Sequence, residues 1–99
     1  MKKSLFLSVA AIIGLTAGVA AAGTLDDTIA RGHVKCGVSG GSPGFSEVDD
    51  SGKRVGFDVD YCRALASAIF NDPMAVKFTP LSSSVRFTAL ASGEVDILA

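Results

Sequence analysis

Residues 56–70, with the sequence GFDVDYCRALASAIF, constrain the fold of this chain more than any other stretch. Apolar side chains recur there at spacings of three and four, at Val59, Cys62, Leu65, Ala66 and Ile69. This spacing predicts an amphipathic helix whose apolar stripe packs against a sheet. Asp58 is the expected N-cap, and Asp60 adds a carboxylate in the first turn, where backbone N–H groups lack partners. Asn71-Asp72-Pro73 ends the helix.

Three short runs around this helix have the character of strands. Residues 33–38 (HVKCGV) place Val34, Cys36 and Val38 on one face and predict the first strand. Residues 75–78 (AVKF) predict a second strand, and residues 94–99 (EVDILA) predict a third. Strands that alternate with helices indicate an α/β fold with a parallel sheet and right-handed βαβ crossovers.

Two further helices and a hairpin complete the expected order. Thr24 is expected to cap a short first helix that Gly32 ends, and one of Ser82, Ser83 or Ser84 to cap a helix over residues 85–92. Residues 45–57 predict a hairpin inserted between the first strand and the central helix, with residues 49–52 (DDSG) as its turn.

The first 22 residues have the pattern of a signal peptide. Met1-Lys2-Lys3 is a basic start, residues 5–19 are apolar, and Ala20-Ala21-Ala22 has the small residues of a cleavage site. The alternative is a membrane anchor, for which the apolar run is short and lacks a charged stop. We expect the mature chain to begin near Gly23 and to be exported.

The charge balance argues against a polyanionic partner. Loss of Lys2 and Lys3 would leave 7 of the 9 basic residues against 10 acidic ones, a net charge of about −3. Neither nucleic acid nor an anionic membrane surface is therefore expected as a partner. Cys36 and Cys62 would enter an oxidising compartment, where they either form a disulfide or remain two small buried side chains. With His33 alone beside them, no metal site is expected.

The loops after the first two strands are the candidate binding region, because ligands in such folds sit at the carboxyl ends of strands. Residues 37–44 (GVSGGSPG) allow close approach of the backbone to another group, although a bare turn remains an alternative. The spacing of a phosphate-binding P-loop is absent. Arg86 could hold a carboxylate, or it could be an ordinary surface cation.

Catalytic patterns are absent from the sequence. The acidic residues are scattered among a turn, a helix start and a strand entry, and no serine sits in a GxSxG elbow. The single histidine lies far in sequence from the serine-rich segment at 82–84. Neither general acid–base catalysis nor a catalytic triad is therefore expected, and no cofactor is implied.

These elements together resemble the periplasmic amino-acid-binding proteins of ABC uptake systems, solute-binding protein family 3, and most closely the general L-amino acid binding branch. The resemblance rests on the strand VKCGV, the hairpin leading into VGFDVDYCRALASAIF, the stretch VKFTPLSSSVRFTAL and the closing SGEVDIL. It covers residues 24–99. It implies a two-lobed type II periplasmic-binding-protein fold, of which residues 23–99 form the N-terminal part of the first lobe, after a signal peptide at 1–22.

The resemblance also implies a function and a set of contact residues. Members of the family trap an L-amino acid between their lobes and deliver it to an inner-membrane ABC permease. Transferred to this chain, the ligand contacts fall on Ser39, Gly40, Ser42, Ser83 and Ser84. Ser39 stands where many relatives carry an acidic residue, and Ser42 and Ser83 stand at or near aromatic positions, which favours a pocket of broad specificity. An exported enzyme of the same fold, of the dehydratase or lytic transglycosylase type, is the alternative.

Overall fold

The computed structural model describes residues 23–99, so the expected signal peptide at 1–22 lies outside the described residues. Eight elements follow one another along the chain: α1 (Thr24–Arg31), β1 (Val34–Val38), β2 (Glu47–Val48), β3 (Arg54–Val55), α2 (Phe57–Phe70), β4 (Val76–Pro80), α3 (Arg86–Ala91) and β5 (Ile97–Leu98). The element types and their order match the sequence prediction. Within residues 23–99, no helix is long and apolar enough to span a bilayer.

The central sheet is parallel, as predicted, with the strand order β4-β1-β5. β1 pairs with β4 along its whole length, from Val34 opposite Val76 to Val38 opposite Pro80. The pairing with β5 covers only Cys36 and Gly37, so β5 is shorter than the expected strand at 94–99. β2 and β3 form the predicted antiparallel hairpin.

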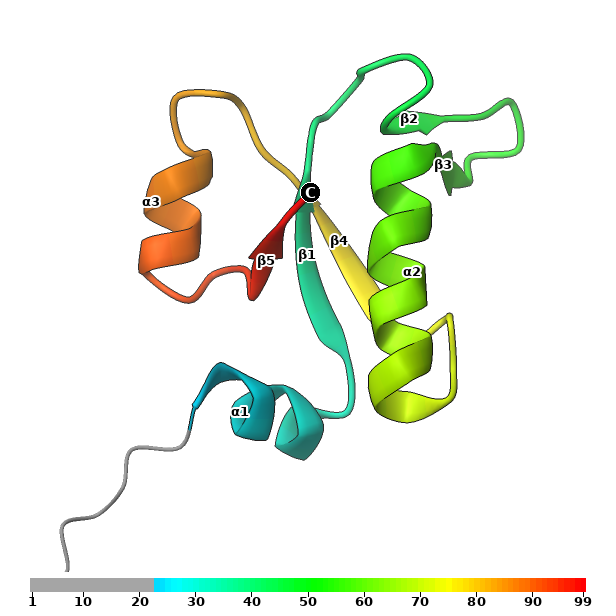
Figure 1. Ribbon diagram of the computed structural model, residues 1–99. Coiled ribbons are helices and arrows are strands. Elements are labelled where there is room, and N and C mark those ends of the chain that lie inside the picture. Colours follow the sequence, from blue (N-terminus) through cyan, green and yellow to red (C-terminus); the bar gives the residue numbers. More distant parts are fainter. Residues whose placement is uncertain (1–22) are drawn as a thin grey trace, which may run out of the picture.

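Helices cover both faces of this sheet (Figure 1): α2 lies on one face and α3 on the other. On the α2 side the apolar stripe is only partly closed. Val59, Cys62 and Ala66 are fully buried, whereas Leu65 and Ile69 are half-buried along an apolar groove beside Ile97. Cys36, Val38 and Cys62 form the buried cluster between α2 and the sheet, and Val76, Phe78 and Ile97 pack against it.

Cys36 and Cys62 are within bonding reach in the structure, as the face-to-face packing of β1 and α2 predicts. Their sulfur atoms form a disulfide, and their Cα atoms lie 6.3 Å apart. Both side chains are completely buried. The bond therefore fixes the central strand to the central helix inside the core.

The predicted helix caps were wrong. No side chain caps α1, α2 or α3: their N-cap residues are Gly23, Gly56 and Val85. At α2, the N–H groups of Phe57 and Asp58 donate to the carbonyls of Gly44 and Phe45 at 3.0 Å each, so the preceding loop caps the helix and Asp58 lies inside it. At α3 the carbonyl of Ser82, not a serine hydroxyl, accepts from Val85 and Arg86.

Gly56 is the point where the hairpin turns into α2. Its φ of +131° is a conformation that residues with a side chain rarely adopt. A Cβ at this position would lie 2.3 Å from the carbonyl oxygen of Phe45, which is impossible without moving the backbone. This close approach brings the loop carbonyls onto the helix end, and it fixes the loop that follows β1.

Candidate functional site

The loops after β1 and β4 lie side by side, because the two strands are parallel neighbours that end in register. We call these loops, residues 39–46 and 81–85, the carboxyl edge of the sheet. They border an open hollow of about 440 Å³, which is lined by Ser39, Gly40, Pro80, Leu81, Ser82 and Ser83. The expected meeting of the two loops is therefore found.

The structure brings together three of the five predicted contact residues. Ser39, Gly40 and Ser83 line the hollow, whereas Ser42 and Ser84 do not. The N–H and the carbonyl of Ser42 both pair with Ser46, at 2.8 and 2.9 Å, and close the loop. The Ser84 hydroxyl lies 3.1 Å from that of Ser82 in the turn that leads to α3.

Two lining residues, Pro80 and Leu81, lay outside the predicted ligand-facing loops, and a third, Ser82, belonged to the predicted loop at 82–84 but not to the five predicted contacts. The prediction ended the second strand at residue 78, but β4 continues to Pro80, and the N–H of Leu81 still donates to the carbonyl of Val38 at 2.8 Å. The extra pairing carries these residues to the hollow. Lys77 and Thr79 also interrupt the apolar run, so no side-chain pattern marks the true end of the strand.

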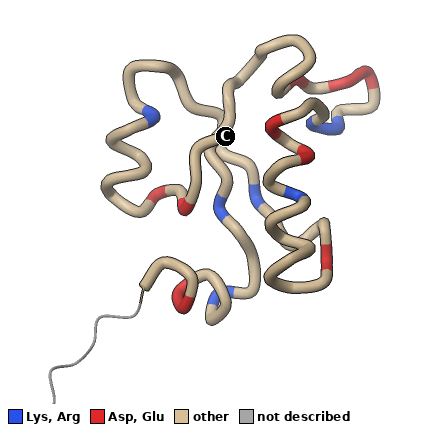
Figure 2. Tube along the Cα trace, viewed as in Figure 1, with Lys and Arg blue, Asp and Glu red and all other residues tan. Residues whose placement is uncertain are grey.

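The lining of the hollow offers hydrogen-bonding groups but no titratable side chain. It supplies serine hydroxyls and backbone groups, and none of its side chains is acidic or basic. Figure 2 shows the same absence of charge on both loops of the carboxyl edge, whereas acidic residues lie on the hairpin turn, at the start of α2, on α1, after α2 and before β5. Such a lining can bind polar groups but offers no general acid or base.

A cation lies behind the loop that follows β1, and sequence reasoning missed it. Arg54, from β3, donates from Nη1 to the carbonyls of Ser39 and Gly40 at 3.3 and 3.4 Å and to the hydroxyl of Ser46 at 3.0 Å. It is not among the residues that line the hollow. A lone arginine in a two-residue strand of a hairpin carries no sequence signal of such contacts.

Arg86, the cation singled out in the sequence, does not border the hollow. It lies half-buried at the start of α3, where its Nη2 donates to the carbonyl of Ala99 at 3.3 Å. The guanidinium also lies 5.8 Å from the ring centroid of Phe87. The bond to Ala99 connects α3 to the residue that follows β5.

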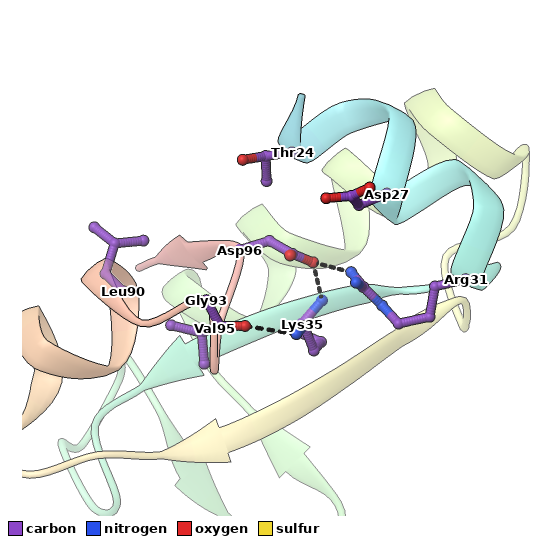
Figure 3. Close-up of a pocket in the computed structure, with 8 residues that line it drawn as sticks. All are labelled: Thr24, Asp27, Arg31, Lys35, Leu90, Gly93, Val95 and Asp96. Carbon is purple, nitrogen blue, oxygen red and sulfur yellow. Dashed lines mark hydrogen bonds and ion pairs between the residues drawn. The ribbon is translucent and has the colours of Figure 1, made fainter. Parts of the chain in front are cut away.

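A second polar cluster lies at the opposite edge of the sheet, where the strands begin. Asp96 accepts hydrogen bonds from the guanidinium of Arg31 and from the N–H of Lys35, the latter at 2.8 Å, and the ammonium of Lys35 donates to Gly93 at 2.6 Å. Figure 3 shows these groups directed toward one another around a cavity of about 170 Å³. We call this cluster the amino edge. Its charged groups satisfy each other and fix α1 to the sheet.

No metal centre is formed by the described part of the chain. Across residues 23–99, no three His, Cys, Asp or Glu side chains are close enough together to hold an ion. His33 lies beside the amino edge, away from the hollow. Burial, together with the charges of Lys77 and Arg31, lowers the pKa of His33.

Comparison with known proteins identifies relatives of this architecture. The family model described as bacterial extracellular solute-binding proteins, family 3, matches residues 34–99. A glutamate/glutamine/aspartate/asparagine-binding protein from Rhodobacter capsulatus is 53% identical over 98 residues, which are 99% of this chain and 29% of the relative. A general L-amino acid-binding periplasmic protein from Rhizobium johnstonii is also 53% identical, over 90% of this chain and 26% of the relative.

Solved structures agree with this relationship. An ABC transporter periplasmic binding protein from Brucella ovis with glutathione bound superposes with a TM-score of 0.74 and 61% identity, over 78% of this chain and 24% of that protein. A more distant match, at 31% identity and a TM-score of 0.70, is an ancestral cyclohexadienyl dehydratase, of which this chain covers 31%. The chain thus spans less than a third of the length of each of these proteins.

Proposed function

Because the chain belongs to the bacterial extracellular solute-binding proteins of family 3, we propose that it forms the N-terminal part of the first lobe of a periplasmic protein that binds L-amino acids and delivers them to an inner-membrane ABC permease. Residues 1–22 would then be the signal peptide, and the Cys36–Cys62 disulfide would form on export. The relatives that are named as amino-acid-binding proteins, at 53% identity, support this assignment.

The observation that carries the proposal is the lining of the hollow. An amino acid is a small polar zwitterion, and its binding requires hydrogen-bonding groups held at fixed positions around it. Ser39, Gly40 and Ser83 supply such groups on the loops that follow two adjacent strands paired in register. We therefore propose Ser39, Gly40 and Ser83 as ligand contacts.

The absence of titratable side chains from the hollow favours binding over the alternative of an exported enzyme. A dehydratase or a lytic transglycosylase needs a placed acid or base, and the hollow's six lining residues include neither. The likeness to the ancestral dehydratase comes from the shared fold, which does not by itself carry a function.

In this proposal, residues 23–99 form only one wall around a ligand. Burying both charged ends of a zwitterion requires partners on all sides, because an unpaired buried charge is costly. The hollow opens to solvent, and we expect this chain alone to bind amino acids only weakly, with a Kd of about 1 to 100 mM.

A chimera tests the proposal. Residues 24–99 of this chain would replace the matching segment of the Rhodobacter capsulatus relative, and calorimetry would measure the affinity for L-glutamate and L-glutamine. We expect submillimolar binding, and complete loss of binding in a folded chimera would contradict the proposal. Ser83→Leu should weaken binding at least about tenfold, whereas Ser84→Leu in the same turn should change it little, because Ser84 does not line the hollow.

A further inference from the structure

We propose that Arg54 is a positioning residue that turns the N–H of Gly40, which lines the hollow, and beside it the N–H of Gly41, toward a side-chain carboxylate or carboxamide oxygen of the bound amino acid. This inference rests on the proposed function. Its starting point is the bond from Arg54 Nη1 to the carbonyls of Ser39 and Gly40, at 3.3 and 3.4 Å. A charged donor strengthens hydrogen bonds to carbonyl groups.

The guanidinium is itself held in place. Its Nη1 donates to the hydroxyl of Ser46, which is completely buried and whose backbone is paired with Ser42. The backbone of Arg54 is fixed by the pairing of its strand with Val48 and by Arg63, whose Nη2 donates to the carbonyl of Arg54 at 3.3 Å. Arg54 therefore connects a rigid hairpin to the loop that borders the hollow.

The direction of each carbonyl determines the direction of the N–H group of the next residue, because the peptide unit is planar. In a trans peptide the N–H points opposite to the carbonyl of the preceding residue, and no peptide bond in the described part of the chain is cis. With the carbonyls of Ser39 and Gly40 directed at Arg54, the N–H groups of Gly40 and Gly41 point away from it. We place the hollow on that side because Gly40 lines it and the Cβ position of Gly40 lies 3.9 Å from Pro80 at the end of β4, whereas Arg54 is not part of the lining; Gly41 follows just outside the lining.

These two N–H groups are free to bind a ligand. Among the hydrogen bonds within residues 23–99, none uses the N–H of Gly40 or of Gly41. The next N–H along the chain, that of Ser42, is already bonded to Ser46 at 2.8 Å. Two successive N–H donors in an open loop favour an acceptor that carries negative charge, and the positive charge of Arg54 behind the loop adds to that preference.

The unliganded chain tests the positioning role. NMR of the exported chain would compare wild type, Arg54→Ala, Arg54→Lys and, as a matched loss of charge, Lys53→Ala, since Lys53 is exposed in the same hairpin. In Arg54→Ala we expect the residual dipolar couplings of the Gly40 and Gly41 amides to fall toward zero, while those of β1 and α2 stay unchanged. Arg54→Lys should restore them in part. Unchanged couplings in Arg54→Ala would overturn the proposal.

Titration with L-glutamate, with L-alanine as a ligand that lacks the side-chain acceptor, tests the binding half. We expect the Gly40 and Gly41 amides to shift more with glutamate, and the apparent Kd to rise about tenfold in Arg54→Ala and less than about twofold in Lys53→Ala. If the two variants lost the same affinity for L-glutamate, the loss of one positive charge in the hairpin would explain the effect, and the proposal would be overturned. If neither amino acid shifts any amide at about 100 mM, the proposed function fails, while the unliganded couplings still decide whether Arg54 orients the loop.

Discussion

The two edges of the sheet use polar groups in opposite ways. At the amino edge, the carboxylate of Asp96 bonds to Arg31 and to the N–H of Lys35, and the Lys35 ammonium bonds to Gly93, so the charges neutralise one another. At the carboxyl edge, the N–H groups of Gly40 and Gly41 have no acceptor within residues 23–99, and the carbonyls beside them are held by Arg54.

This difference shows how the same sheet separates stability from binding. Polar groups that satisfy one another form a fixed contact between elements and leave little to offer a ligand. Polar groups that neighbouring residues hold in position, but that have no hydrogen-bond partner within the protein, are preorganised to bind a ligand. The comparison predicts that changes at the amino edge affect stability alone, and changes at the carboxyl edge affect the hollow.

The largest expected effect comes from the core that both edges share. Removing the disulfide with Cys36→Ala and Cys62→Ala should lower the free energy of unfolding by about 3 to 4 kcal/mol, because the bond closes a loop of 26 residues in the unfolded chain. Urea unfolding of the exported chain, followed by circular dichroism, measures it. Both edges should lose order together.

The control for this prediction is the wild-type chain treated with a reductant. It should show the same loss as the double variant, because its structure has no other cysteine to react. Reactive thiols in the folded, untreated protein would contradict the existence of the bond. Loss of order at only one edge would contradict the shared core.

The second prediction separates the carboxyl edge from the rest. Gly56→Ala should cost about 2 to 3 kcal/mol and disorder the loop at 39–46, because the new Cβ would lie 2.3 Å from the Phe45 carbonyl. Gly52→Ala is the matched control: its φ of +83° is also positive, but no atom lies within 4 Å, so about 1 kcal/mol is expected. Equal losses in the two variants would show that the contact with Phe45 is not what matters.

The sequence was sufficient for the parts of this fold that depend on periodicity. The apolar stripe of α2, the alternation in β1 and the turn at 49–52 identified the sheet, the crossover and the hairpin, and from them followed the meeting of the loops at one edge. These features are local patterns that extend over several residues, so one residue that departs from the pattern does not change the prediction.

The predictions of the helix caps were wrong because the caps depend on hydrogen bonds between particular backbone groups. Asp58 and Thr24 are good capping residues, yet the carbonyls of Gly44 and Phe45 occupy the end of α2, and Gly23 stands at the N-cap of α1. Main-chain pairing also shapes the loop after β1, where the backbone of Ser42, a predicted ligand contact that does not line the hollow, is bonded to Ser46. Contacts of this kind are made by any residue's main chain, so no side-chain pattern records them.

The third prediction tests the amino edge. Asp96→Asn should lower the free energy of unfolding by about 1 to 2 kcal/mol, because it weakens the bonds to Arg31 and to the N–H of Lys35 in a partly buried position. The matched control is Asp60→Asn, whose ion pair with Arg63 is 4.0 Å long with a carboxylate that is 77% exposed, and which should cost less than about 0.5 kcal/mol. Amide shifts at Gly40 and Gly41 should not change in either variant. A shift there would contradict the independence of the two edges.

The smallest effect concerns the pH dependence of the amino edge. Burial, then the charges of Lys77 and Arg31, hold the pKa of His33 below its ordinary value of 6.5, so the folded chain binds this proton more weakly than the unfolded chain does. The stability that depends on neutral His33 is therefore complete above that value and is lost as the pH falls below it. The pKa of Asp49 is lowered by hydrogen bonds from Ser51 and Lys53, so Asp49 gains a proton only below pH 3.8. The pH ranges in which His33 and Asp49 titrate therefore do not overlap.

Urea unfolding between pH 7.5 and 5.5 therefore isolates the histidine. The wild-type chain should become slightly less stable across this window, and His33→Gln should remove that part of the slope, because glutamine does not gain a proton. Asp49→Asn, the control, should leave the slope unchanged, since Asp49 stays ionised throughout. If the slope of His33→Gln equals that of the wild type, another group senses the pH. If the slope of His33→Gln is steeper than that of the wild type, His33 is stabilised in its charged form by Asp96, the one neighbour whose charge raises the pKa of His33.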